Sequence, residues 1–200
     1  MSQPNQAIRV FIAAPISLPA KLVLTQVIGN LGGNIPSEIR WVNPDGIHLT
    51  IKFLGDVPSE EIAGITEAMV RAAAKISPFE VGLSGLGVFP NRKEPRVLWA
   101  GVDGDLATLT QLQESTEVEL TAAGYPKDRR RFNPHLTLGR VRGQASEYTR
   151  RSIGPMVSSH QMPGSDPWTV ESVELIQSHL GPEGATYTTL TTASLKGVQI

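Results

Sequence analysis

Two of the four histidines in this chain open the same tripeptide, His48-Leu49-Thr50 and His135-Leu136-Thr137. Each tripeptide lies in an apolar, strand-like run. In an extended strand, residues i and i+2 project from the same face. Each motif therefore presents an imidazole beside a hydroxyl, with its leucine pointing the other way. Two such pairs are suited to holding one phosphate group.

Hydrolysis of a phosphodiester needs a base for the attacking water, an acid for the leaving oxygen and donors for the non-bridging oxygens. His48 and His135 provide the acid and base, because the ordinary imidazole pKa allows one ring to be neutral and the other charged. In-line displacement places the entering and leaving oxygens on opposite sides of phosphorus. We therefore expect the two histidines on opposite walls of a cleft.

Strict alternation along the first strand places His48, Thr50 and Lys52 on the cleft face and Leu49, Ile51 and Phe53 on the core face. The positively charged Lys52 would then accompany the first histidine.

In the second strand, His135 and Thr137 oppose the two leucines 136 and 138. Alternation places Arg140 on the leucine face unless Gly139 marks a bulge that turns the guanidinium toward the cleft. Thr50, Thr137 and Arg140 are the candidate phosphate ligands.

Other chemistries have weaker support. A shared zinc is conceivable for two histidines, but no acidic residue stands near either motif at ligand spacing, and Asp45 and Asp56 are typical of turns. No metal site is therefore predicted. A serine hydrolase lacks its Gly-x-Ser-x-Gly elbow. His160 and His179 have no comparable neighbours and are interpreted as structural.

Composition limits the class of protein. Two hundred residues with 40% hydrophobic content suit one sizeable domain, or one domain made of two lobes. Cysteine is absent, which excludes thiol catalysis and fits a reducing cytoplasm. The apolar run at residues 10–14 is broken by Pro15 and favours a first strand over a signal peptide. No run approaches the ~20 apolar residues of a membrane span.

The net charge of −1 excludes a strongly basic, non-specific nucleic-acid coat. Positive charge is nevertheless concentrated locally. The stretch RRRFNPHLTLGRVR at 129–142 holds five arginines without an acid, which favours an anionic ligand near the second motif. A smaller basic set, Arg92, Lys93 and Arg96, lies in the turn FPNRKEPR.

Periodicity predicts strands near 8–14, 38–42, 47–54, 79–89, 96–102, 135–141, 168–179 and 185–194. Helices are predicted at 18–31, from Pro58 to about 76, at 105–123 and at 146–153. Connections between most adjacent strands are too short for parallel crossovers. We therefore expect a single bilobal α+β domain over 1–200, with two antiparallel sheets, helices outside and one motif in each lobe around a central cleft.

At these residues the sequence resembles the two-histidine (2H) phosphoesterases, specifically the RNA 2′,3′-cyclic phosphodiesterases once named 2′-5′ RNA ligases. The pattern His-x-Thr-x occurs at 48–51 and 135–138. The likeness extends to RVFIA at 9–13, FLG at 53–55, PRVLWAGV at 95–102, FNPHLTLGRVR at 132–142 and ELIQSHLGPEGATYTTL at 174–190. It covers nearly the whole chain.

The resemblance implies hydrolysis of a terminal 2′,3′-cyclic phosphate on RNA to a 2′-phosphomonoester, without a metal or other cofactor. It implies His48 as the general acid at the 3′ oxygen, His135 as the base, and Thr50, Thr137 and Arg140 on the phosphate. Tyr187 in the tail motif is a candidate for stacking on a base, or else a core residue. Phe11 is expected in the core, and the protein is expected to be a cytoplasmic monomer.

Three functions stay open at this point. The first is the RNA cyclic phosphodiesterase, whose site run in reverse would ligate 2′-5′ ends. The second is the same chemistry on a small cyclic phosphate of ADP-ribose or a nucleotide. The third is a non-catalytic RNA-binding module, which the two intact His-Thr pairs argue against because binding alone does not require two imidazoles.

Overall fold

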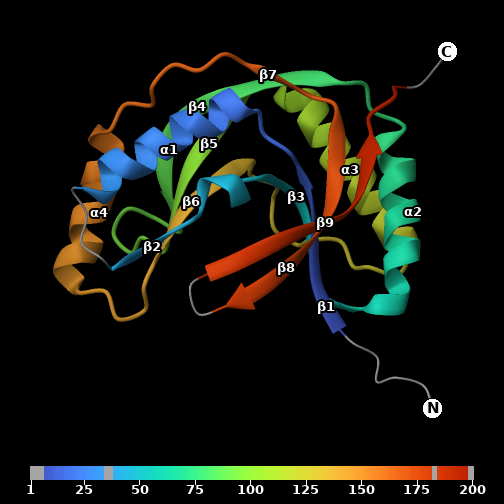
Figure 1. Ribbon diagram of the computed structural model, residues 1–200, viewed down its shortest axis with the longest axis horizontal. Coiled ribbons are helices and arrows are strands. Elements are labelled where there is room, and N and C mark those ends of the chain that lie inside the picture. The colour runs from blue at the N-terminus through green and yellow to red at the C-terminus, as the bar shows by residue number, and fades with distance from the viewer. Residues whose placement is uncertain (1–6, 34–37, 182–183, 198–200) are drawn as a thin grey trace.

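A computed structural model describes residues 7–33, 38–181 and 184–197 (Figure 1). The strands are β1 (Ala7–Ala14), β2 (Ile39–Trp41), β3 (Leu49–Pro58), β4 (Phe79–Phe89), β5 (Val97–Gly104), β6 (His135–Val141), β7 (Trp168–Val170), β8 (Ser172–Gly181) and β9 (Gly184–Ser194). The helices are α1 (Leu18–Gly32), α2 (Ile62–Ala73), α3 (Leu106–Ala122) and α4 (Glu147–Ser159). These elements confirm the expected α+β class and the order of strands and helices.

The nine strands of the described residues belong to one antiparallel sheet, in the order β7-β4-β5-β6-β3-β1-β8-β9 with β2 paired to β6. The expectation of two separate sheets is wrong in this respect. The two halves of the sheet are joined where Leu49 of β3 pairs with Leu136 of β6. The residues that join them are the central leucines of the two motifs, so the junction of the halves is also the place where the motifs meet.

The helices surround the curved sheet, with α1 and α4 on one side of Figure 1 and α2 and α3 on the other. Local signals explain where three of them begin. Ser17, Asp105 and Ser146 each accept a backbone N–H bond three residues along, at the starts of α1, α3 and α4. Apolar side chains of α1, α2 and α3 then enter the core.

Helix α4 is longer than predicted, because it continues past Pro155 to Ser159. A proline normally ends or kinks a helix, because it lacks the backbone N–H and its ring clashes with the preceding turn. Here Ile153 and Val157 are buried on either side of the proline and hold the last turns against the core. Gly154 packs tightly against the chain at Arg92, where an added Cβ would lie 2.6 Å from the carbonyl oxygen.

Strand β3 does not alternate strictly. Thr50 pairs with Ala13 of β1 and Lys52 pairs with Ile12, so Ile51 is the extra residue of a bulge. As a result Lys52 turns into the protein, where 3% of its side chain is exposed, and Phe53 is 46% exposed on the other face. The predicted placement of Lys52 in the cleft and Phe53 in the core is therefore wrong for both residues.

Lys52 forms a buried ion pair. Its Nζ lies 2.9 and 3.1 Å from the carboxylate oxygens of Glu117 on α3 and donates to the carbonyl oxygen of Pro126 at 2.9 Å. Asp128 lies 3.5 Å from the same nitrogen. The ammonium group thus ties the segment before the second motif to the strand that carries the first motif.

Candidate active site

His48 lies between a 3-10 turn at Pro44–Gly46 and the start of β3. Its Nδ1 is 2.8 Å from the carbonyl oxygen of Gly46. A carbonyl oxygen only accepts hydrogen bonds, so Nδ1 carries the hydrogen and donates it. The Nε2 atom is then left as the nitrogen that can exchange a proton with a ligand.

His135 opens β6 and is held in the same way. Its Nδ1 donates to the carbonyl oxygen of Asn133 at 2.8 Å, again two residues earlier in the chain. Both motifs therefore fix the same tautomer by the same local contact. A hydrogen bond of this kind orients the imidazole for acid–base catalysis.

An aromatic side chain contacts each imidazole. Phe11 of β1 stacks on His48 with ring centroids 4.4 Å apart and planes at 29°, and Tyr187 meets the same imidazole edge-on at 5.2 Å and 81°. Phe89 of β4 meets His135 edge-on at 5.0 Å and 87°. These rings remove water from one side of each histidine.

The loss of water lowers the pKa of both imidazoles. Burial lowers the pKa of His48 from 6.5 to about 4, with smaller lowering effects from the charges of His135 and Lys21, while the hydrogen bond to Gly46 opposes the shift. Burial also lowers the pKa of His135, and the charge of Arg140 adds to this effect, opposed by the bond to Asn133. Both imidazoles are therefore neutral at pH 7 when the cleft holds no anion.

Two cavities meet at the motifs. One, of about 360 Å³, is lined by His48, and the other, of about 850 Å³, is lined by His135. Thr50, Thr137 and Arg140 line both. The two hydroxyls and the guanidinium thus form a shared floor, with one histidine on each side of it.

The pairing of Leu49 with Leu136 explains this arrangement. Antiparallel strands run in opposite directions, so the residues that flank this pair occur in opposite order. Across the two strands, Thr137 of β6 therefore lies beside His48, and Thr50 of β3 lies beside His135. One register therefore places all four polar side chains of the motifs around the shared floor.

Arg140 reaches the cleft through a bulge in β6. Leu98 of β5 pairs with Gly139 and Trp99 pairs with Thr137, so Leu138 is the additional residue. This confirms the bend that the sequence suggested beside Gly139. Glycine is required there because an added Cβ would lie 2.9 Å from a methyl group of Ile39 and 3.0 Å from the ring of Trp41.

Tyr187 of β9 lines the cavity of His48 and is 37% exposed. Burial raises the pKa of its phenol, and the positive charge of Arg140 opposes this effect. The structure thus places Tyr187 at the cleft, with its ring against Phe11 and His48.

Phe11 is buried as predicted, but it packs with Ala13 and Ile176 in a small cluster separate from the main core. Its contact with His48 was not foreseen. The alternation of Val10, Phe11 and Ile12 in β1 carried the signal, because Phe11 faces away from its two core neighbours.

Arginines 129 to 131 line the larger cavity together with Phe132 and Asn133. His160 and His179 lie outside both cavities. His160 ends α4 with its backbone N–H bonded to Met156, and the ring of His179 lies 3.3 Å from the Thr188 hydroxyl on the β8–β9 hairpin.

In the described parts of the chain, no group of three or more His, Asp or Glu side chains is arranged to hold a metal ion. Within 7–33, 38–181 and 184–197, no helix is long and apolar enough to cross a membrane.

Known proteins resemble this chain along most of its length. The family described as "LigT like Phosphoesterase" matches residues 18–99 and 102–187. Curated relatives named RNA 2′,3′-cyclic phosphodiesterase include one from Archaeoglobus fulgidus, 31% identical over 90% of this chain and 96% of its own length. One from Methanothermobacter thermautotrophicus is 33% identical over 76% of this chain and 80% of its own length. One from Geobacillus stearothermophilus is 38% identical over 65% of this chain, but the match spans only 41% of that relative.

Solved structures share the fold. TT0787 of Thermus thermophilus superimposes with a TM-score of 0.77 and 27% identity, covering 96% of this chain and 100% of that one. LigT of E. coli, solved in complex with 3′-AMP, gives 0.74 at 23% identity over 95% and 99% of the two chains. The family match includes both His-x-Thr-x motifs, and the chain therefore belongs to the LigT-like phosphoesterase family.

Proposed function

We propose that this protein hydrolyses 2′,3′-cyclic phosphate ends of RNA to 2′-phosphomonoesters by metal-independent acid–base catalysis. The observation that carries the proposal is the shared floor of Thr50, Thr137 and Arg140, with His48 in one adjoining cavity and His135 in the other. This arrangement provides ligands for the phosphate and a proton-transfer group on each side of phosphorus.

In the proposed reaction, water enters from the side of His135. Nε2 of His135 takes a proton as the water oxygen bonds to phosphorus, and Nε2 of His48 gives a proton to the 3′ oxygen as the P–O3′ bond breaks. The phosphate stays attached to the 2′ oxygen. Thr50, Thr137 and Arg140 bind the non-bridging oxygens, whose negative charge must be stabilised in the transition state.

The acid role of His48 requires a charged imidazole, whereas its pKa of about 4 keeps it neutral in the empty cleft at pH 7. A bound cyclic phosphate carries a negative charge, which favours the imidazolium and raises this pKa. The proposal therefore includes substrate-assisted protonation of His48.

The curated relatives named RNA 2′,3′-cyclic phosphodiesterase support RNA as the substrate class. Tyr187 lines the His48 cavity beside the shared floor, and we propose that its aromatic ring stacks on the terminal base. One chain carries both histidines and the three residues of the shared floor, so the proposed reaction needs no second subunit, and we propose a monomer as the functional unit.

The size of the His135 cavity favours ligation as a second candidate. Its volume of about 850 Å³ exceeds the space that one water molecule needs and falls in the range of small-molecule sites. A nucleoside 5′-hydroxyl placed there would replace water and form a 2′-5′ link, which is the reverse of cleavage at such a link.

Hydrolysis of a short RNA with a 2′,3′-cyclic phosphate end, assayed in excess EDTA, tests the proposal. We expect turnover that is unchanged by the chelator. Loss of activity in EDTA that is recovered on addition of zinc would contradict the metal-independent mechanism.

A further inference from the structure

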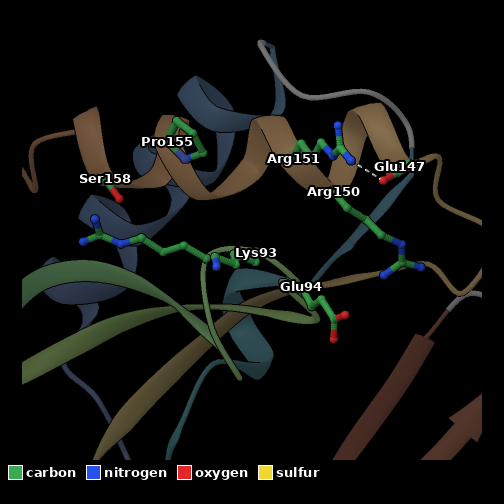
Figure 2. A pocket seen from close by; sticks show the side chains of 8 residues that line it. Lys93, Glu94, Glu147, Arg150, Arg151, Pro155 and Ser158 are labelled. Carbon is green, nitrogen blue, oxygen red and sulfur yellow. Dashed lines mark hydrogen bonds and ion pairs between the residues drawn. The ribbon is translucent and has the colours of Figure 1, made fainter.

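A second cluster of positive charge faces α4. The loop between β4 and β5 carries Arg92, Lys93 and Arg96, and α4 carries Arg150 and Arg151. A cavity of about 730 Å³ is lined by residues of both this loop and the helix. In Figure 2, Arg150 and Arg151 extend from α4, while Lys93 and Glu94 belong to the loop below it.

Two smaller cavities lie between this cavity and the catalytic cleft, and each shares lining residues with its neighbours. The first lies beyond the cleft floor and is lined by Arg40, Arg140 and Arg142. The second shares Val141 and Gly143 with the first, and shares Glu94 and Arg150 with the large cavity. These three adjacent cavities form a row from Arg140 to α4, which we call the basic path.

The charge on the basic path differs from that of the rest of the protein. Among the described residues, eight arginines and lysines line it, against the two acids Glu94 and Glu147. The chain as a whole has a net charge of −1. Glu147 is paired with Arg151, Oε1 to Nη2 at 2.5 Å, which leaves an excess of positive charge along the path.

The walls of the basic path are held in place by backbone contacts. The guanidinium of Arg150 donates to the carbonyl oxygens of Arg142, Gly143 and Ala145 at 2.9 to 3.2 Å. The close packing of Gly154 on Arg92 fixes the loop against the helix. The path is therefore part of the folded structure.

We propose that the basic path binds the phosphodiester backbone of the RNA strand whose cyclic phosphate end lies in the cleft. This inference rests on the proposed function and extends it from the terminal nucleotide to the body of the substrate. Most of the cationic side chains on the path are exposed, which suits the solvated phosphates of a polymer. A cyclic mononucleotide occupies only the cleft and gains nothing from them.

The matched substrates are a 12-nucleotide RNA ending in a 2′,3′-cyclic phosphate and a nucleoside 2′,3′-cyclic phosphate. The path variant is Arg92→Gln/Lys93→Gln/Arg151→Gln. We expect about a tenfold rise in KM for the RNA at low salt, with kcat unchanged and the mononucleotide kinetics unchanged.

The control variant is Arg71→Gln/Lys75→Gln/Lys196→Gln, which removes the same charge away from the path. In Figure 1, α2, which carries Arg71, lies on the opposite side of the molecule from α4. This variant should leave the KM and kcat for both substrates unchanged. An equal rise in KM for the two triple variants would show that the effect comes from the net charge of the protein alone, and this would overturn the proposal.

A binding measurement separates the basic path from the catalytic proposal. Fluorescence anisotropy with the RNA ending in a 2′-phosphate needs no turnover. The slope of log K against log salt is negative, and each lost phosphate contact makes it less steep by about 0.7, so the path variant should reduce its magnitude by about 2. An unchanged slope would refute the basic path. Failure to hydrolyse either cyclic substrate would instead contradict the proposed function. In that case the salt dependence of binding would still show whether the basic path contacts the RNA.

Discussion

Leu49 and Leu136, the middle residues of the two motifs, pair with each other where the two halves of the sheet join. Both side chains are fully buried. This one pair brings together segments 87 positions apart, fixes their register and directs the flanking His and Thr side chains to the shared floor. The proposed reaction requires the two motifs to act as one site.

The first prediction concerns the two histidines. His48→Ala and His135→Ala should each lower kcat by about 10²–10⁴-fold, because each removes one member of a proton-transfer pair. Circular dichroism should show an unchanged fold, since both rings face the cleft. More than a tenth of the wild-type activity in either variant would contradict the mechanism.

The second prediction concerns pH. The value of kcat/KM reports the free enzyme, in which one imidazole must be charged and the other neutral. The pKa values of His48 and His135 both lie below 6.5 in the empty cleft. The bell-shaped profile of kcat/KM should therefore have its maximum below pH 6.5, and a wild-type maximum above pH 7 would refute the burial argument.

The contact of Phe11 with His48 provides a control for that prediction. Phe11→Ala readmits water to the imidazole, so the pKa of His48 should rise toward 6.5. The profile should then move to higher pH, and an NMR titration of the histidine should show the same direction.

Sequence patterns predicted the motif strands well because alternation is a local property. The pairs His48 with Thr50 and His135 with Thr137 needed only period two. The inward turn of Lys52 was not predictable, because the bulge at Ile51 depends on how β3 pairs with β1. Arg140 was recoverable in part, because Gly139 marked its bulge. The joining of two sheets into one depends on the Leu49–Leu136 pair, which no local pattern specifies.

The third prediction uses two neighbouring arginines. Arg140 lines the shared floor, whereas Arg142 lies farther along β6 and beyond it. Arg140→Lys keeps the charge but loses the bidentate fork, which should cost about 1–3 kcal/mol of transition-state stabilisation. Arg142→Lys should change little. The value of kcat/KM on a nucleoside 2′,3′-cyclic phosphate compares the two variants. Equal, small decreases would show that Arg140 does not bind the phosphate.

The fourth prediction concerns the buried ion pair of Lys52 and Glu117. Lys52→Met leaves the Glu117 carboxylate buried without its ammonium partner, which should lower the free energy of unfolding by about 3–5 kcal/mol. The double variant Lys52→Met/Glu117→Leu removes both charges and should recover most of that loss. Urea denaturation measures both variants, and a single variant as stable as the wild type would contradict the role of the pair.

The identity of the product tests the central claim most directly. A short RNA with a 2′,3′-cyclic phosphate end, incubated with the enzyme in EDTA, gives a product whose phosphate position can be read by ³¹P NMR or by comparison with authentic 2′- and 3′-phosphate standards. With His48 protonating the 3′ oxygen, the account predicts the 2′-phosphomonoester alone. Formation of the 3′-phosphomonoester, or of both isomers, would contradict the proposed placement of acid and base across the shared floor.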